Sequence, residues 1–273
     1  MNILDKIVIN KQKEIKWDKK NFPLQFLLDL IAEGLPSTRD FFGCLNNSSN
    51  ISIIAELKFA SPSRGVINKE RKLEEIIRAY TVGGAAAISV LTERNFFQGD
   101  PDNIRKVKKI TTLPVLRKDF ILDKYQIYQS RCLGADAILL IASLLDESTL
   151  MRFQKIASSL GMDCLVEVHN IGELNKALAA ESNIIGINNR NLDDFSIDLS
   201  TTGKLSHLIP RDCLLISESG IKKYLDLEKL SFYGIDAVLI GEALMSADNP
   251  ENKLKGLLGV LKRKEEKKQI YAG

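Results

Sequence analysis

Eight short apolar segments recur along the chain after about residue 50, and amphipathic segments with apolar residues at helical spacing separate them. They lie near residues 51–57, 85–91, 113–117, 136–142, 163–168, 183–188, 213–217 and 236–241. Continuous apolar strands that alternate with helices are typical of a parallel sheet covered by helices. Gly83, Gly134, Gly161 and Gly234 follow helical segments, where a left-handed cap favours glycine. The pattern predicts an α/β fold of eight β–α units.

Eight parallel strands can form an open doubly wound sheet or a closed barrel. No G-x-G-x-x-G sequence follows the first strand, so the dinucleotide-binding open sheet lacks its usual support. A length of 273 residues is close to the roughly 250 of a typical barrel. We therefore predict a single (β/α)8 TIM barrel domain over residues 1–273, with an N-terminal helical extension over residues 1–50 within it.

Composition argues against several classes of protein. The net charge of +3 is small and gives no electrostatic case for nucleic-acid binding. No run of 18 apolar residues occurs and the N-terminus is charged, so we expect neither a membrane span nor a secretory signal, and a cytoplasmic location. Two histidines and four scattered cysteines, which we expect to be buried thiols, suggest no metal site. No interface is evident, so a monomer is the default.

Polar side chains stand at the ends of five of the predicted strands. Glu56 and Lys58 are two residues apart at the end of the first strand, so they should share one face. This pair alone is equally compatible with a structural ion pair. The other four strands end near further polar groups, which are Lys118, Glu167, Asn188, Arg190 and Glu218. The C-terminal strand ends of such a barrel carry its active site, so the repetition favours catalysis.

Glycines follow the last two predicted strands, as Gly220 and Gly241. Each could belong to an ordinary strand-to-helix turn, but loops after strands seven and eight often bind phosphate through backbone N–H groups. Their joint position favours a phosphate site. Ser61 could add a hydroxyl donor, whereas the carboxylate of Glu242 would repel phosphate, so only its backbone N–H is assigned to binding.

The residues carry a family resemblance. IIAELKFASPSRG, LTERNFFQGD, LRKDFILDKYQIYQSRCLGADAILLI, LVEVHN, IGINNRNL, ISESGI and LIGEALM resemble the successive motifs of the indole-3-glycerol phosphate synthase family, over residues 2–262. The resemblance implies a lyase of tryptophan biosynthesis. Its substrate would be 1-(2-carboxyphenylamino)-1-deoxyribulose 5-phosphate, which it converts to indole-3-glycerol phosphate, carbon dioxide and water. The family uses no cofactor and no metal.

The resemblance also implies roles for individual residues. Lys118 matches the general acid of ring closure, and Glu167 matches a general base. Lys58 matches the partner of the substrate carboxylate and an acid in dehydration. The polar groups that orient these three match Glu56, Asn188 and Glu218. Positions that contact phosphate match Ser61, Ser219, Gly220, Gly241 and Glu242. Positions around the anthranilate ring and the wall match Phe97, Phe120, Leu139, Arg190, Leu192 and Phe195.

The chemistry independently requires such groups. A substrate with a phosphate and a carboxylate needs cations, and attack on a ketone needs an acid at the developing alkoxide. Lys58 and Lys118 meet both needs. Burial or mutual repulsion would lower a lysine pKa, whereas Glu56, Glu167 and Glu218 would oppose that lowering, and the pattern leaves the balance open. The order in which the two lysines act also stays open, with Lys118 first as the hypothesis.

Two alternatives for the function remain, and the positions of the N-terminal extension and of His169 are also open. Another phosphosugar barrel enzyme, such as phosphoribosylanthranilate isomerase, would share the phosphate loops, and a non-catalytic paralogue would bind a ligand without turnover. The extension over residues 1–50 could cap the barrel or cover the mouth of the site, through Trp17 or Phe41 and Phe42. His169 could face the site or be a hydrogen-bonded residue at a strand end.

Overall fold

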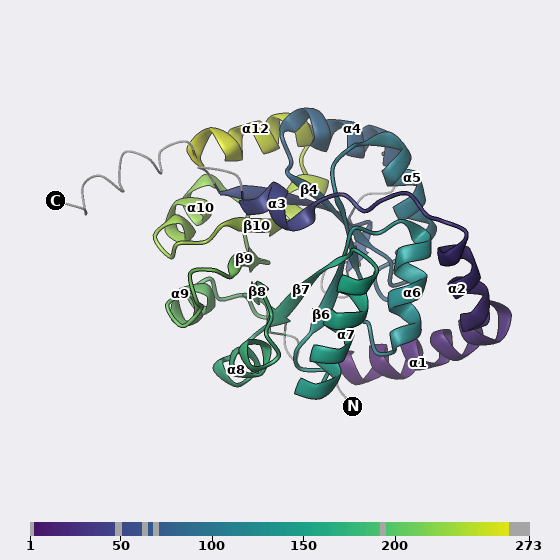
Figure 1. Ribbon diagram of the computed structural model, residues 1–273. Helices are drawn as coiled ribbons and strands as arrows, with labels where there is room; N and C mark the ends of the chain where they lie inside the picture. The colour runs from purple at the N-terminus through teal and green to yellow at the C-terminus, as the bar shows by residue number, and fades with distance from the viewer. Residues whose placement is uncertain (1–2, 47–50, 62–64, 68–70, 192–194, 262–273) are drawn as a thin grey trace.

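Eight parallel strands close into a barrel in the order β1, β10, β9, β8, β7, β6, β5, β4 (Figure 1). The computed structural model describes residues 3–46, 51–61, 65–67, 71–191 and 195–261. The strands are β1 Ser52–Leu57, β4 Ala87–Leu91, β5 Val115–Lys118, β6 Ala137–Ile141, β7 Asp163–Val168, β8 Ile184–Asn188, β9 Leu214–Glu218 and β10 Ala237–Ile240. The predicted (β/α)8 barrel is confirmed, and each strand lies within a few residues of its apolar segment.

Helices surround the barrel on its outside (Figure 1). They are α4 Leu73–Gly83, α5 Asp102–Ile110, α6 Lys124–Leu133, α7 Glu147–Ser159, α8 Ile171–Ala179, α9 Ser200–Ser206, α10 Tyr224–Ser231, α11 Glu242–Met245 and α12 Pro250–Leu261. A short antiparallel pair, β2 Ala60–Ser61 and β3 Gly65–Val66, follows β1. No helix among these ranges or in the described N-terminal part is long and apolar enough to cross a membrane.

One of the four predicted glycine caps is wrong. Gly134, Gly161 and Gly234 have positive φ as expected, but α4 continues through Gly83 and the left-handed residue is Gly84, with φ 94°. A Cβ on Gly83 would lie 2.9 Å from a methyl carbon of Leu254. Gly83 is therefore needed for the close approach of α12 rather than for a turn. All four cysteines are free thiols, although only Cys164 is buried.

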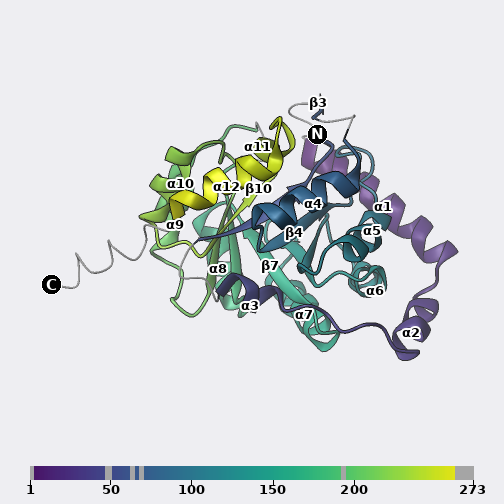
Figure 2. The same ribbon diagram turned by 90° about the horizontal axis from the view of Figure 1, so that it is seen from above.

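The N-terminal helices α1 Ile3–Asn21, α2 Leu24–Ala32 and α3 Phe41–Asn46 take different places around the barrel. Figure 2 shows α3 at one end, opposite α11 and β3. Phe41 is fully buried in a cluster with residues at the starts of strands, such as Ile184 and Ala237. Trp17 is exposed and packs edge-on against Phe22. Helix α3 therefore caps the end of the barrel where the strands start, as one of the two alternatives predicted. Trp17 does not line the predicted site.

Helix α1 is attached to the barrel by a buried lysine. Lys11 is 1% exposed, and its Nζ lies 2.9 Å from Oδ1 of Asp119, which directly follows β5. The other oxygen of Asp119 accepts a hydrogen bond from Arg117 at 2.9 Å. Burial acts to raise the pKa of Asp119, but Lys11 and Arg117 hold it well below its usual range. The N-terminal helix thus reaches the residue beside Lys118.

Candidate active site

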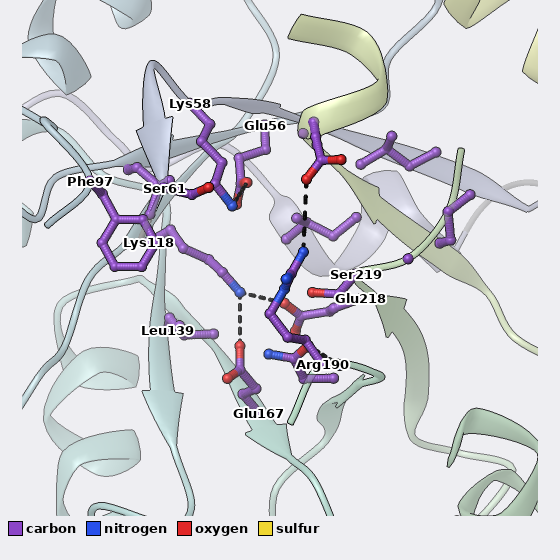
Figure 3. A pocket seen from close by; sticks show the side chains of 18 of the residues that line it. Glu56, Lys58, Ser61, Phe97, Lys118, Leu139, Glu167, Arg190, Glu218 and Ser219 are labelled. Carbon is purple, nitrogen blue, oxygen red and sulfur yellow. Dashed lines mark hydrogen bonds and ion pairs between the residues drawn. The ribbon is translucent and has the colours of Figure 1, made fainter. Parts of the chain in front are cut away.

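A pocket opens at the C-terminal ends of the barrel strands (Figure 3). Every predicted site residue within the described ranges lines it, and Leu192 lies outside those ranges. These residues are Glu56, Lys58, Ser61, Phe97, Lys118, Phe120, Leu139, Glu167, Asn188, Arg190, Phe195, Glu218, Ser219, Gly220, Gly241 and Glu242. Parallel strands bring their carboxyl ends to one face, which explains why residues almost 190 positions apart in the chain meet here.

Lys118 occupies the centre of the pocket between two carboxylates. Its ammonium group donates a hydrogen bond of 2.9 Å to Oε2 of Glu167, from β7, and another to Oε2 of Glu218, from β9 (Figure 3). All three side chains are largely buried, since Lys118 is 13% exposed, Glu167 4% and Glu218 1%. One ammonium group therefore holds together acids from two other strands.

The pKa values of the three groups follow from this arrangement. Burial acts to lower the pKa of Lys118, but Glu167, Glu218 and Glu56 raise it above its usual range. Burial acts to raise the pKa of Glu167, yet Lys118 and His169 lower it to about 2. Burial and the charge of Glu167 raise the pKa of Glu218 to about 7, against the opposing effect of Lys118. The carboxylates thus keep Lys118 protonated. This resolves the balance between burial and neighbouring charge that the sequence left open.

Small residues make room for the carboxylates. A Cβ on Gly186, in β8, would overlap the carboxylate of Glu218, and a Cβ on Gly241 would overlap that of Glu56. The φ of Gly241 is −114°, so its turn does not require glycine. Glycine at these two positions is explained by the polar groups packed against them.

The pocket has an aromatic side. The rings of Phe97 and Phe120 lie 6.2 Å apart between centroids, and Nζ of Lys58 lies 5.7 Å from the centroid of Phe97. Nζ of Lys58 is also 3.5 Å from Oε1 of Glu56, so the two side chains share a face as predicted. A cation beside a pair of aromatic rings suits a planar aromatic carboxylate.

The opposite side of the pocket is built from the loop after β9 and from cations. Ser219 and Gly220 both have positive φ, 64° and 84°, directly after β9. The carboxylate of Glu242 lies 3.8 Å from Arg190 and 4.0 Å from Lys222. Its side chain therefore does line the pocket, where two cations offset its charge. Among the described residues, no group of three or more His, Cys, Asp or Glu side chains could hold a metal ion.

Comparison with known proteins identifies the family. The family model described as indole-3-glycerol phosphate synthase matches residues 4–257. The chain belongs to this family. A relative of that name from Acetivibrio thermocellus is 49% identical over 254 residues, which are 93% of this chain and 98% of the relative. One from Legionella pneumophila is 46% identical over 258 residues, 94% of this chain and 98% of the relative.

Solved structures add agreement about the fold alone. The 3-hexulose-6-phosphate synthase from Salmonella typhimurium superposes with a TM-score of 0.64 at 15% identity, covering 78% of this chain and all of that one. A thiamine phosphate pyrophosphorylase from Pyrococcus furiosus gives a TM-score of 0.59 at the same identity, over 78% of this chain and 96% of that one. At such identity, the likeness shows the barrel fold alone.

Several residues that line the pocket of this family member were not predicted from the sequence. Lys222 follows Gly220 by two positions, and its charge beside the predicted phosphate loop was a usable signal. Leu91 and Leu239 gave no such signal, because apolar residues at strand ends look like core. Ile197 lies in the segment between β8 and α9 and carries no polar group that would mark it. Asp119 lines the pocket as well, and its partner Lys11 could not be found from local pattern.

Proposed function

We propose that this protein is an indole-3-glycerol phosphate synthase, a carbon–carbon lyase of tryptophan biosynthesis. It closes the ring of 1-(2-carboxyphenylamino)-1-deoxyribulose 5-phosphate, releases the carboxylate as carbon dioxide and eliminates water. The observation that supports this best is the Lys118 ammonium between Glu167 and Glu218, in a pocket with an aromatic wall and a cationic, glycine-containing end.

Ring closure needs an acid at the ketone oxygen, and Lys118 fits this role. The surrounding carboxylates keep the amine protonated, so a proton is available when the aryl carbon attacks. An alkoxide is a strong enough base to take that proton even from a lysine with a raised pKa. The charge that develops on oxygen is stabilised by the same ammonium group before transfer.

Lys58 suits the carboxylate of the substrate and the later dehydration. It lies beside the Phe97 ring, where an anthranilate ring would stack, so its charge would face a carboxylate on that ring. The hydroxyl group formed at ring closure remains after loss of carbon dioxide, and its departure as water requires a second proton. Glu56, 3.5 Å from Lys58, would orient the ammonium group.

Glu167 suits removal of the final ring proton. Its low pKa keeps it ionised, and a hydrogen bond with Asn188 contributes to that low pKa. Glu218, at the end of β9, would hold Lys118 in place through its hydrogen bond. The phosphate would lie at the opposite end, against Ser61 and the backbone of Ser219, Gly220, Gly241 and Glu242, with Arg190 and Lys222 nearby. Leu139 and Phe195 would complete the wall.

The direct test is indole fluorescence after addition of the carboxyphenylamino-deoxyribulose phosphate to purified, metal-stripped protein. Turnover is expected, with none on phosphoribosylanthranilate. Turnover of phosphoribosylanthranilate alone would favour an isomerase, and tight binding without turnover would favour a non-catalytic paralogue. Single-turnover kinetics of Lys118→Ala and Lys58→Ala test the order of the acids, because ring closure should fail only in Lys118→Ala.

We further propose that the protein acts in the cytoplasm as a monomer. Sedimentation velocity should give one species of the monomer mass, and a stable dimer would refute this assignment.

A further inference from the structure

A second cavity, of about 450 Å³, lies beside the pocket and shares Asn188 and Arg190 with it. We call it the side cavity. Its lining is mostly polar and consists of Leu4, Ser143, His169, Asn170, Glu173, Asn188, Asn189, Arg190, Asn191, Ser196, Asp198 and Thr201. Among these residues, His169 contacts Glu167 of the Lys118 site, and Glu173 contacts His169 in turn.

His169 is held between two carboxylates. Its Nδ1 lies 3.0 Å from Oε2 of Glu173, which also accepts a hydrogen bond of 2.9 Å from the His169 backbone N–H. Its Nε2 lies 3.4 Å from Oε1 of Glu167. Nε2 is buried and hydrogen-bonds no group in the described parts of the chain. One edge of the ring is therefore fixed, and the other faces the proposed base.

Glu167 uses its two oxygens for different partners. Oε2 accepts from Lys118, whereas Oε1 faces His169. The four groups form a continuous row, from Glu173 through His169 and Glu167 to Lys118. The row begins at the side cavity and ends at the centre of the pocket.

The proposed reaction makes such a row useful. The substrate loses its carboxylate as carbon dioxide and its ketone oxygen as water. Two protons are given to oxygen and one is taken from carbon, so each turnover consumes one proton from solvent. Lys118 and Glu167 are 13% and 4% exposed, and a bound substrate or product would fill the pocket in front of them.

We propose that His169 is a positioning residue that carries protons from the side cavity to Glu167 and, through it, to Lys118. This rests on the proposed function. The Nε2–H bond of the charged ring breaks as an Oε1–H bond forms on Glu167. The carboxyl group then rotates about its Cγ–Cδ bond, which brings this proton to the Lys118 side, and gives it to the neutral Lys118 amine. A buffer acid or hydronium ion in the side cavity recharges the ring. Glu173 stabilises the charged ring throughout.

The charges around the ring agree with this role. Burial acts to lower the pKa of His169, but the hydrogen bond to Glu173 and the charges of Glu167, Glu173 and Glu218 raise it above its ordinary value. The ring therefore stays charged to higher pH than a free histidine. Arg190 and Asp198 are the charged residues that line the side cavity from the β8–α9 segment.

The test replaces His169 with alanine and adds imidazole. We expect kcat to fall by roughly 10-fold, below the roughly 10²–10⁴-fold effect of groups that act on the reacting atoms, with KM close to wild type. Imidazole should restore kcat in a saturable way, and rescue should weaken as pH rises and imidazolium is lost. His207→Ala is the matched control, because the chain has only two histidines and His207 is exposed.

Two outcomes would overturn the inference. One is a His169→Ala enzyme with wild-type kcat from pH 6 to 9, and the other is a loss that imidazole does not rescue. If His169→Ala does not fold, Glu173→Gln replaces it and should also lower kcat by severalfold. Histidine NMR gives a readout without turnover, since Glu167→Gln should lower the pKa of His169. Absence of turnover in the wild type would instead refute the proposed function.

Discussion

The buried contact between Lys11 and Asp119 allows a quantitative prediction about the N-terminal helix. In Lys11→Met, α1 keeps an apolar side chain of similar length but Asp119 loses one of its two cations. Both side chains are almost fully buried, at 1% and 0% exposed. Removing one member of a buried ion pair costs about 3–5 kcal/mol when the other charge is left alone.

Asp119 is not left alone, which reduces the expected loss. Arg117 still donates to it at 2.9 Å and the Thr92 hydroxyl at 2.6 Å. We therefore expect Lys11→Met to lose about 2 kcal/mol of unfolding free energy, between the cost of one unmade charged hydrogen bond and that of an isolated buried charge. Because Asp119 follows Lys118 directly, kcat should also fall.

Lys19→Met is the matched control on the same helix. Its Nζ lies 2.7 Å from Asp123, but the two side chains are 44% and 34% exposed. Surface ion pairs of this kind contribute about 0–1 kcal/mol. Urea unfolding of the two variants measures the difference. Equal losses, or a Lys11→Met loss below roughly 0.5 kcal/mol, would show that burial does not make this pair important.

Two further changes test the carboxylates around Lys118. Gly186→Ala should lower the free energy of unfolding by about 1–3 kcal/mol and also lower kcat, because its Cβ would displace the Glu218 carboxylate. Gly256→Ala in α12 is the control, because open space surrounds Gly256 and no loss of stability is expected. Equal losses in the two variants would contradict the packing argument. Glu218→Gln should gain stability relative to wild type between pH 4 and 8. In the folded wild type the pKa of Glu218 is about 7, whereas its ordinary value is 4.5. The wild type therefore loses stability as pH rises from 4.5 to about 7, and the glutamine variant does not. At about 1.36 kcal/mol per pKa unit the gain approaches roughly 3 kcal/mol, and a pH-independent difference would refute it.

The strands and their polar ends were predictable because they depend on local pattern. Eight apolar segments specify eight buried strands, and parallel strands must end at one face, so Lys58, Lys118, Glu167 and Glu218 had to converge. No distance in the structure was needed for that conclusion.

Other features depend on docking between distant segments, which local pattern does not encode. Lys11 looks like an ordinary exposed helix residue until α1 packs against Asp119, more than 100 positions away. Gly83 looked like a helix cap because its contact with Leu254, 171 positions further along the chain, leaves no trace in the local pattern. The charge of Lys118 depends on how closely carboxylates from other strands approach it, which only the packed barrel determines.

The most direct test of the account is the turnover of Lys118→Ala with the carboxyphenylamino-deoxyribulose phosphate, measured beside Lys222→Gln. Lys222 lines the same pocket at its proposed phosphate end and is more than half exposed. Lys118→Ala should lose at least roughly 100-fold in kcat with little change in KM, and Lys222→Gln should raise KM with kcat nearly unchanged. A Lys118→Ala enzyme with kcat close to wild type would contradict the assignment of this lysine as the acid.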